Sequence, residues 1–335
     1  MTALNPMNRR DWLATSAAGL AGLCGAAHAQ TRADAASGWP QKPIRIVVGF
    51  PAGTSPDLLA RALAEPLAQA LGQSVVVENR VGAAGAIGAE VLSKATDQHT
   101  LGVVGNAAVT SVPMIYRKLP YSPKDLRGIT VIGTSPMLIV AANAVTFNSP
   151  ADFFAEARKA GTRWSYGSLG IGSSAHLGGE LLKSRAGFEA VHVPYNGAPA
   201  VINAMIGGDI QLATLPIGTA LTQVQAGRIK AVALTSASRS ILASNVPALP
   251  EAGINALNIE IWNALMAPAS LPQPIFDKIS AVAMQLLRAP ELRQKLFQMG
   301  WKADGTTPEA MDNRIHEDTL LFRDIITSRK ITVEG

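Results

Sequence analysis

Hydroxyl and glycine residues gather in two short segments that each follow a strand-like run and open a helix-like run. Residues 51–57 (PAGTSPD) form the first segment, and residues 168–176 (SLGIGSSAH) form the second. The start of a helix directs free backbone N–H groups and the positive end of the helix dipole toward one point. No set of acid, base and nucleophile surrounds either segment. The two segments therefore predict a protein that holds a small anion rather than converting it.

The second segment also contains groups used in nucleophilic catalysis. A serine hydrolase needs a serine, a base and an orienting acid that converge in space. The sequence has no G-x-S-x-G elbow, and His176 lies within one helical turn of Ser173 and Ser174. We therefore expect His176 to hydrogen-bond to the backbone of its own loop. An exported serine hydrolase that uses Ser173 or Ser174 with His176 is the alternative interpretation.

Neither a nucleotide nor a metal is expected as a cofactor. Residues 170–175 match the dinucleotide pattern G-x-G-x-x-A, but such a site requires an acidic residue at the end of the next strand. The next strand-like run ends in residues 193–196 (VPYN), which contain no acid. The histidines outside the amino-terminal segment show no spacing typical of paired metal ligands.

Two further features complete the predicted edge of the site. Asp57 begins the helix after the first turn, where we expect it to interact with the helix dipole and to fix the N–H groups of the turn. Tyr195 and Asn196, followed by a glycine, form a third polar turn between a strand and a helix.

Short apolar runs alternate with amphipathic runs along the chain, a pattern typical of parallel βαβ units in an α/β fold. The predicted strands are 44–50, 74–78, 100–104, 138–142, 163–167, 190–193, 210–214 and 231–236. The predicted helices are 56–71, 86–94, 150–159, 175–184, 199–206, 220–225, 275–288, 289–299 and 308–327.

These strands are too many for one comfortable sheet, so we expect two lobes. The apolar runs 129–140 and 260–266 are predicted to be the two crossings between them. Residues 39–136 plus 259–335 then form lobe 1, and residues 137–258 form an inserted lobe 2. Ligands of such sheets bind at the carboxyl ends of the strands. Both glycine-rich turns lie at that edge, facing the cleft.

Composition restricts the possible partners. The chain has 335 residues, 48% hydrophobic and 5% aromatic, with a formal charge of +5. Its basic residues are scattered, so we expect no nucleic-acid partner, and we expect a monomer. Cys24 is the single cysteine.

The first 29 residues have the layout of a bacterial signal peptide. Arg9 and Arg10 precede an apolar run, and residues 27–29 (AHA) supply a cleavage site near Ala29. Both a twin-arginine signal and an ordinary Sec signal fit this pattern. We therefore expect cleavage near Ala29, loss of Cys24 and a periplasmic mature protein.

Several blocks of the mature chain carry a family resemblance. They include residues 39–44 (WPQKPI), 72–80 (GQSVVVENR), 191–197 (VHVPYNG) and 248–253 (ALPEAG). With these blocks, in this order, the chain resembles the receptors of tripartite tricarboxylate transporters, the Bug family of extracytoplasmic solute-binding proteins.

The resemblance implies a two-lobed periplasmic-binding-protein fold, a type II-like Venus flytrap in which helices flank a central sheet in each lobe. It also implies that the lobes close on a small carboxylate, held by backbone amides, hydroxyls and bridging waters. Delivery to a membrane permease, or sensing, is the implied role.

The chain departs from the family pattern at several positions. Thr54 replaces a glycine of the first turn, Pro56 replaces a hydroxyl residue, and Asn106 lies where Thr/Ser-rich sequences are common. Many members carry an aspartate that pairs with a ligand's ammonium group at the position of Leu215. Burying an ammonium without a partner is costly. We therefore expect a carboxylate that lacks an α-amino group, with an apolar body against Leu215.

Together these arguments give one set of candidate ligand-binding residues. They are Phe50, Ala52, Thr54, Ser55, Asp57, Asn106, Ser168, Gly170, Ser173, Ser174, His176, Tyr195, Asn196 and Leu215.

Overall fold

The computed structural model describes residues 38–255 and 258–333. The predicted signal peptide and Cys24 lie outside the described residues. The strands are β1 Ile44–Val48, β2 Val75–Asn79, β3 Thr100–Gly105, β4 Leu126–Ala142, β5 Ser165–Ser168, β6 Val191–Pro194, β7 Leu212–Pro216, β8 Ile229–Leu234, β9 Glu260–Pro268 and β10 Lys302–Ala303.

The helices follow most of the predicted ranges closely. They are α2 Ser55–Leu71, α3 Ala86–Ser93, α4 Asn106–Val109, α5 Val112–Ile115, α6 Pro150–Ala160, α7 Ser174–Ala186, α8 Ala198–Gly207, α9 Ile217–Gln225, α10 Gln273–Arg288, α11 Pro290–Gln298 and α12 Pro308–Ser328. Helices α4 and α5 have no counterpart in the sequence prediction. Each is a single turn, which is too short to show a helical period.

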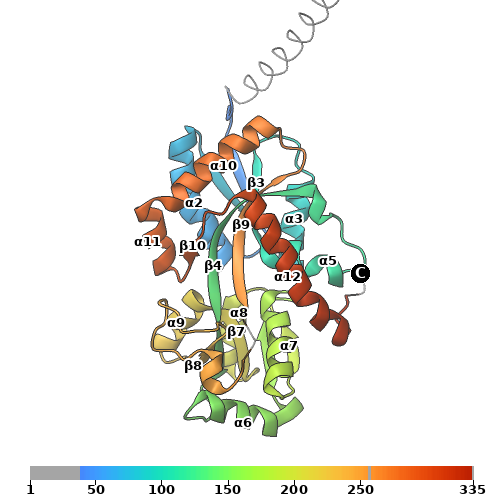
Figure 1. The fold of residues 1–335 in the computed structure, drawn as a ribbon, viewed down its shortest axis with the longest axis vertical. Coiled ribbons are helices and arrows are strands. Elements are labelled where there is room, and N and C mark those ends of the chain that lie inside the picture. The colour runs from blue at the N-terminus through green and yellow to red at the C-terminus, as the bar shows by residue number, and fades with distance from the viewer. Residues whose placement is uncertain (1–37, 256–257, 334–335) are drawn as a thin grey trace, which may run out of the picture.

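Two α/β lobes share the long strand β4 (Figure 1). In the first lobe β1 pairs in parallel with β2 and β3, and β3 continues to β9 and the first part of β4. In the second lobe β5 pairs in parallel with β6 and β7, and the last part of β4 pairs with β7 and β8. Strand β4 changes partners between Pro136, which pairs with β9, and Met137, which pairs with β7.

The two segments predicted to be crossings pair differently in the structure. The 17 residues of β4 run through both lobes, and all but one of them are buried, as in a strand covered on both faces of its sheet. Strand β9, in contrast, pairs only with β3 and β4. The return crossing precedes it, and Ile259 still bonds to Thr235 at the end of the second lobe. The lobe boundaries 39–136 plus 259–335 and 137–258 stay a proposal.

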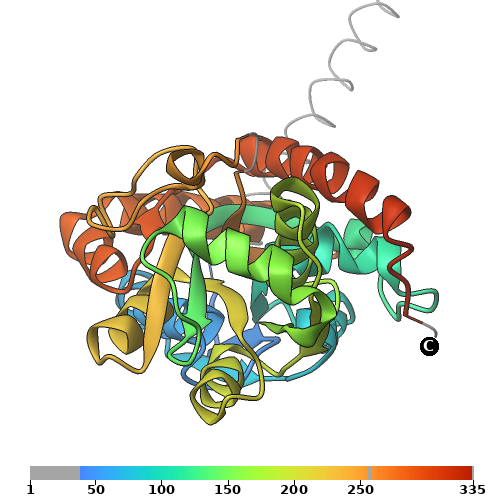
Figure 2. The ribbon, with the colours of Figure 1, turned by 90° about the horizontal axis from the view of Figure 1, so that it is seen from below.

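Of the carboxyl-terminal helices, α12 contacts both lobes. Helix α10 packs on α2 and β4 in the first lobe, whereas α12 contacts both β4 and α7. Figure 2 shows α12 lying along one flank of the molecule, beside helices of both lobes. A separate apolar cluster joins α5, α7 and α12 through Ile115, Leu177, Phe322 and Ile325.

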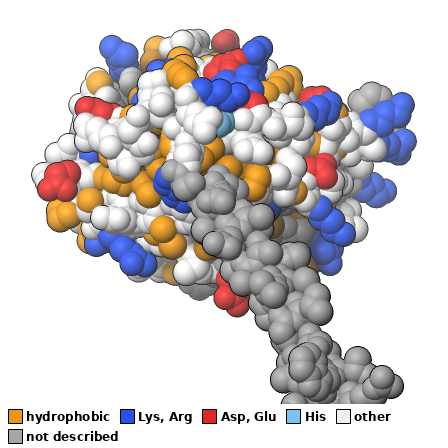
Figure 3. Space-filling view, turned by 90° about the horizontal axis from the view of Figure 1, so that it is seen from above, with side chains coloured by type: hydrophobic (Ala, Val, Ile, Leu, Met, Phe, Trp, Pro, Cys, Tyr) orange, Lys and Arg blue, Asp and Glu red, His pale blue; other side chains and the backbone are white. Residues whose placement is uncertain are grey.

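The upper surface of the first lobe carries scattered Lys and Arg side chains with acidic side chains among them (Figure 3). Within the described part of the chain, no helix combines the length and the apolar composition required to span a membrane.

Candidate ligand-binding site

Two adjoining cavities lie between the lobes and share Phe50, Ala84 and Leu169 as walls. The outer cavity has a volume of about 240 Å³, and the inner cavity has a volume of about 30 Å³. The outer cavity is further lined by Gly49, Pro51, Val81, Gly82, Ala83, Gly85, Tyr116, Gly170, Ile171, Pro194, Tyr195 and Asn196. The inner cavity is further lined by Thr54, Ser55, Pro56, Gly105, Asn106, Ala107, Ser173, Gly197, Ala198, Pro216, Ile261 and Asn263.

Three helices begin at the wall of the inner cavity. Thr54 precedes α2, Ser173 precedes α7 and Gly197 precedes α8, and all three are inner-cavity residues. Helix α2 comes from the first lobe, and α7 and α8 come from the second. Each start presents backbone N–H groups and a partial positive charge. Neither cavity has a Lys or Arg among its wall residues, so these oriented dipoles are the positive potential available to an anion.

Asp57 fixes the turn that precedes α2. Its carboxylate accepts hydrogen bonds from the backbone N–H of Gly53 at 2.9 Å and from the amide of Asn79 at 3.0 Å, and it pairs with Arg61 at 3.0 Å. Burial raises the pKa of Asp57, but the hydrogen bonds from Arg61, Gly53 and Asn79 outweigh it and hold the pKa below its ordinary value. Asp57 therefore shapes the turn and lines neither cavity.

Hydrogen bonds and close contacts join the lobes around the inner cavity. Ser174 in α7 donates to Oδ1 of Asn106 at 2.9 Å, and Ser111 donates to the carbonyl oxygen of Gly172 at 2.6 Å. The methyl group of Thr54 lies 3.1 Å from the position that a Cβ of Gly197 would occupy. A side chain at position 197 would therefore crowd the first lobe, so glycine is required at this contact.

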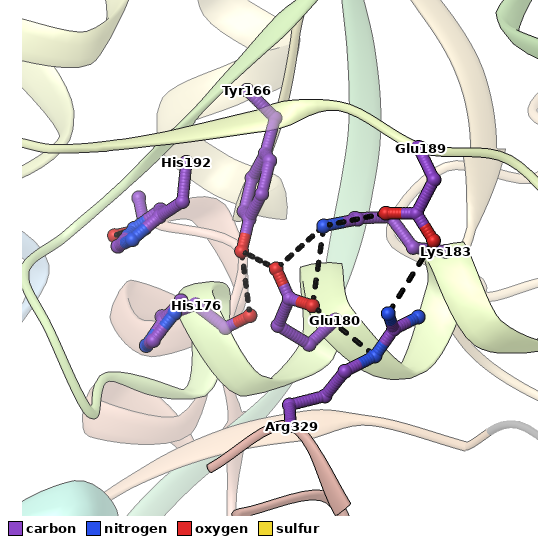
Figure 4. Close-up of polar contacts among 8 residues, drawn as sticks. Tyr166, His176, Glu180, Lys183, Glu189, His192 and Arg329 are labelled. Atoms are coloured by element: carbon purple, nitrogen blue, oxygen red, sulfur yellow. Dashed lines mark hydrogen bonds and ion pairs between the residues drawn. The ribbon is translucent and has the colours of Figure 1, made fainter. Parts of the chain in front are cut away.

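A stacked pair of histidines supports the second glycine-rich turn (Figure 4). The rings of His176 and His192 lie 3.8 Å apart, with an angle of 14° between their planes. Nδ1 of His176 accepts a hydrogen bond from the N–H of Gly172 at 3.1 Å, and His192 bonds to Ser168 at 2.7 Å. Burial lowers the pKa of His176 to about 4 and that of His192 to about 3. Both rings are therefore neutral near pH 7.

Neither serine of the predicted hydrolase alternative bonds to the ring of His176. The hydroxyl of Ser173 accepts the backbone N–H of His176 at 3.2 Å and caps α7, and the hydroxyl of Ser174 donates to Asn106. Ser168 contacts His192, but its side chain is fully buried. The ring of His176 holds the loop backbone, which is the geometry of a structural histidine.

The structure brings most of the predicted residues to the two cavities. Phe50, Thr54, Ser55, Asn106, Ser173, Gly170, Tyr195 and Asn196 line one or both of them. The other six predicted residues line neither cavity. Asp57, Ser168, Ser174 and His176 are buried next to the cavity walls, and Ala52 is exposed. Leu215 is fully buried in the second lobe, beside the wall residue Pro216.

Asn263 lines the inner cavity and was not among the predicted residues. Its sequence signal is a polar residue at a core-facing position of an apolar strand. The side chains of Ile261 and Leu265, two residues away on either side, both belong to the hydrophobic core.

The comparison with known families agrees with this geometry. The family model described as "Tripartite tricarboxylate transporter family receptor" matches residues 59–329. The chain belongs to this receptor family. A relative from Bordetella pertussis, the protein BugT, is 30% identical over 274 residues, which cover 81% of this receptor and 82% of BugT.

Solved structures share the fold of this receptor. A periplasmic transporter protein aligns with a TM-score of 0.82 at 32% identity, covering 88% of this chain and 99% of the other. A protein from R. palustris, solved with adipate, aligns with a TM-score of 0.84 at 27% identity over the same shares of the two chains. The two-lobed periplasmic-binding-protein fold expected from the sequence is confirmed.

Proposed function

We propose that this protein captures a small carboxylate between its lobes, outside the cytoplasm. The observation that carries the proposal is the convergence of the α2, α7 and α8 starts on one cavity whose walls, as far as residues 38–255 and 258–333 form them, contain no cationic side chain. An anion there is stabilised by several oriented N–H dipoles. The adipate-bound relative supports a carboxylate as the anion.

The ligand lacks an α-amino group in this proposal. Neither cavity has an Asp or Glu among its wall residues. The nearest carboxylate to the first turn, that of Asp57, already accepts from Gly53, Asn79 and Arg61. An ammonium group placed beside three helix starts has no counter-charge and loses its hydration. The outer cavity, whose wall includes Phe50 and Leu169, receives the remainder of the ligand.

Export and delivery complete the proposal. The amino-terminal 29 residues direct export and are removed near Ala29, and the closed receptor then delivers its ligand to a membrane permease or to a sensor. Mass spectrometry of the protein recovered from periplasm tests the first step. A mature chain that begins at Gln30 is expected, and a chain that retains Arg9 and Arg10 would contradict it.

A thermal-shift screen over mono-, di- and tricarboxylates, followed by calorimetry of the hits, tests the binding. A ligand at a hundredfold its dissociation constant should stabilise the protein by about 2.7 kcal/mol. Binding only of sugars, or of amino acids more tightly than their deaminated analogues, would overturn the proposal. Covalent labelling of Ser173 or Ser174 by a fluorophosphonate probe would instead favour the hydrolase.

A further inference from the structure

Asn263 is a polar residue placed in the apolar face of β9. Its side chain is fully buried. Within residues 38–255 and 258–333, neither its Nδ2 nor its Oδ1 has a hydrogen-bond partner. An unpaired buried amide is destabilising, and an apolar side chain of similar size at this position avoids that cost. The stability of the strand therefore does not account for asparagine here.

Gly105 lies beside the amide of Asn263, and its lack of a side chain leaves the amide uncovered on that side. In the sheet, Asn263 pairs with Gly105 of β3 and with Gly133 of β4, so glycines flank it on both neighbouring strands. A Cβ at position 105 would lie 3.4 Å from Oδ1 of Asn263. Gly105 and Asn263 both line the inner cavity, so a group bound there lies beside the amide of Asn263.

The side-chain amide of Asn263 has two polar atoms that need hydrogen-bond partners. Nδ2 donates and Oδ1 accepts. A carboxylate oxygen accepts only, so it satisfies Nδ2 and leaves Oδ1 without a donor. A hydroxyl group on the carbon next to the carboxylate supplies that donor, because the two groups of a 2-hydroxycarboxylate present an acceptor and a donor side by side.

We propose that Asn263 determines ligand specificity by selecting a 2-hydroxycarboxylate: Nδ2 donates to a carboxylate oxygen and Oδ1 accepts from the 2-hydroxyl group. This inference rests on the proposed function, because it assumes that the carboxylate binds in the inner cavity. A 2-amino acid also carries a donor at that carbon. Its ammonium, however, faces the helix starts with no carboxylate among the wall residues to balance it.

The inner cavity also limits what reaches Asn263. A cavity of about 30 Å³ has room for roughly two water-sized groups. In this inference the 2-hydroxyl group and one carboxylate oxygen occupy that space beside Asn263, and the rest of the ligand extends past Phe50 and Leu169 into the outer cavity.

Calorimetry with matched acids tests this inference on the mature protein. The probes are malate, succinate and aspartate, and 2-hydroxyadipate, adipate and 2-aminoadipate. We expect one hydroxy acid to bind at least about tenfold more tightly than its deoxy and amino counterparts, since a site that hydrogen-bonds a hydroxyl rejects the analogue without it. In Asn263→Leu the ratio of hydroxy to deoxy affinity should fall to within about threefold.

Ser280→Ala is the matched control. Ser280 is also buried, and its hydroxyl also has no partner among the described residues, but it lies in α10 outside both cavities. The control should keep the wild-type ratio. If Asn263→Leu does not fold, Asn263→Ala gives the same readout.

Two outcomes separate the two proposals. Deoxy acids that bind the wild type as tightly as hydroxy acids, or a ratio unchanged in Asn263→Leu, would overturn the role of Asn263 and leave the carboxylate receptor standing. Failure of every carboxylate to bind would overturn the proposed function, and this inference with it.

Discussion

The hydroxyl of Ser174 in the second lobe donates a hydrogen bond of 2.9 Å to the amide oxygen of Asn106 in the first lobe. Both side chains are buried, and Asn106 also lines the inner cavity. The bond exists only when the lobes are together, so it stabilises the closed arrangement. In a receptor that closes on its ligand, stabilisation of the closed state adds directly to affinity.

Ser174→Ala should therefore weaken ligand binding without affecting the turn itself. The lost bond corresponds to about 1 kcal/mol, or three- to tenfold in affinity. Ser93→Ala is the control, because the hydroxyl of Ser93 donates within its own helix, to the carbonyl oxygen of Glu90. Calorimetry of both variants measures the effect. An unchanged affinity in Ser174→Ala would show that the bond does not contribute to closure.

The backbone contact between Gly218 of α9 and Met299 of the first lobe should be more sensitive to substitution than the Ser174–Asn106 hydrogen bond. A Cβ at Gly218 would lie 1.9 Å from the carbonyl oxygen of Met299, so α9 can approach the first lobe only with glycine at this position. Gly218→Ala should lower the free energy of unfolding by about 1 to 3 kcal/mol, or hold the lobes apart. Chemical denaturation and small-angle scattering distinguish these effects.

Gly207→Ala is the comparison for this variant. Within 4 Å, a Cβ at Gly207 would meet only Oδ2 of Asp209, at 3.6 Å, near the end of α8. This substitution should change stability by no more than about 0.5 kcal/mol. Equal stability and equal scattering of the two variants would contradict the close contact at Gly218.

Asp57→Asn tests the role of the first turn. The substitution removes the ion pair with Arg61 and places an amide N–H against a donor from Gly53 or Asn79. We expect a loss of stability of about 1 to 3 kcal/mol and weaker ligand binding, because the start of α2 shifts. Glu65→Gln, on the exposed face of the same helix, should change neither quantity. Wild-type affinity in Asp57→Asn would mean that the turn keeps its shape without the carboxylate.

The stacked histidines predict a loss of stability in mild acid. The pKa of His176 is lowered from 6.5 to about 4, and that of His192 is lowered from 6.5 to about 3. Below pH 6.5 the unfolded chain therefore binds more protons than the folded chain, and stability falls as the pH decreases. The slope is at most about 1.4 kcal/mol per pH unit for each histidine.

Denaturation between pH 7 and 4.5 measures this effect. Asp57 and Glu189 have lowered pKa values, so their contributions are lost mainly below this window. The nearby positive charge of Lys183 also lowers the pKa of His176. His192→Gln should flatten the pH profile. A variant whose profile is as steep as that of the wild type would contradict the burial of this ring.

The sequence predicted those parts of the fold that depend on local patterns. The run from Ile44 to Val48, the turn after it and α2 follow from apolar runs, glycine and a helix start within a few residues. The number of predicted strands indicated two lobes, and the family blocks implied the same arrangement. Strand β9 pairs with β3 and β4, and its run of nine residues would show the same pattern if it crossed between lobes.

The sequence could not predict contacts between distant residues. Asn106 and Ser174 are 68 positions apart, and nothing in either segment indicates that they meet. Asn263 gives a weak sequence signal, because it is an amide in an otherwise apolar strand. Its proposed role in ligand binding depends on its position beside Gly105 and opposite the helix starts at the inner cavity. Leu215 was predicted to contact the ligand. Its strand, β7, reaches the inner cavity, but the residue in the cavity wall is the neighbouring Pro216, and Leu215 is buried.

A crystal structure with the tightest carboxylate from the screen tests the central claim most directly. We predict that the carboxylate oxygens lie within hydrogen-bond distance of N–H groups at the starts of α2, α7 and α8, with no Lys or Arg side chain against them. A carboxylate paired with a cationic side chain, bound outside the interlobe cavities, or cleaved there would contradict the account.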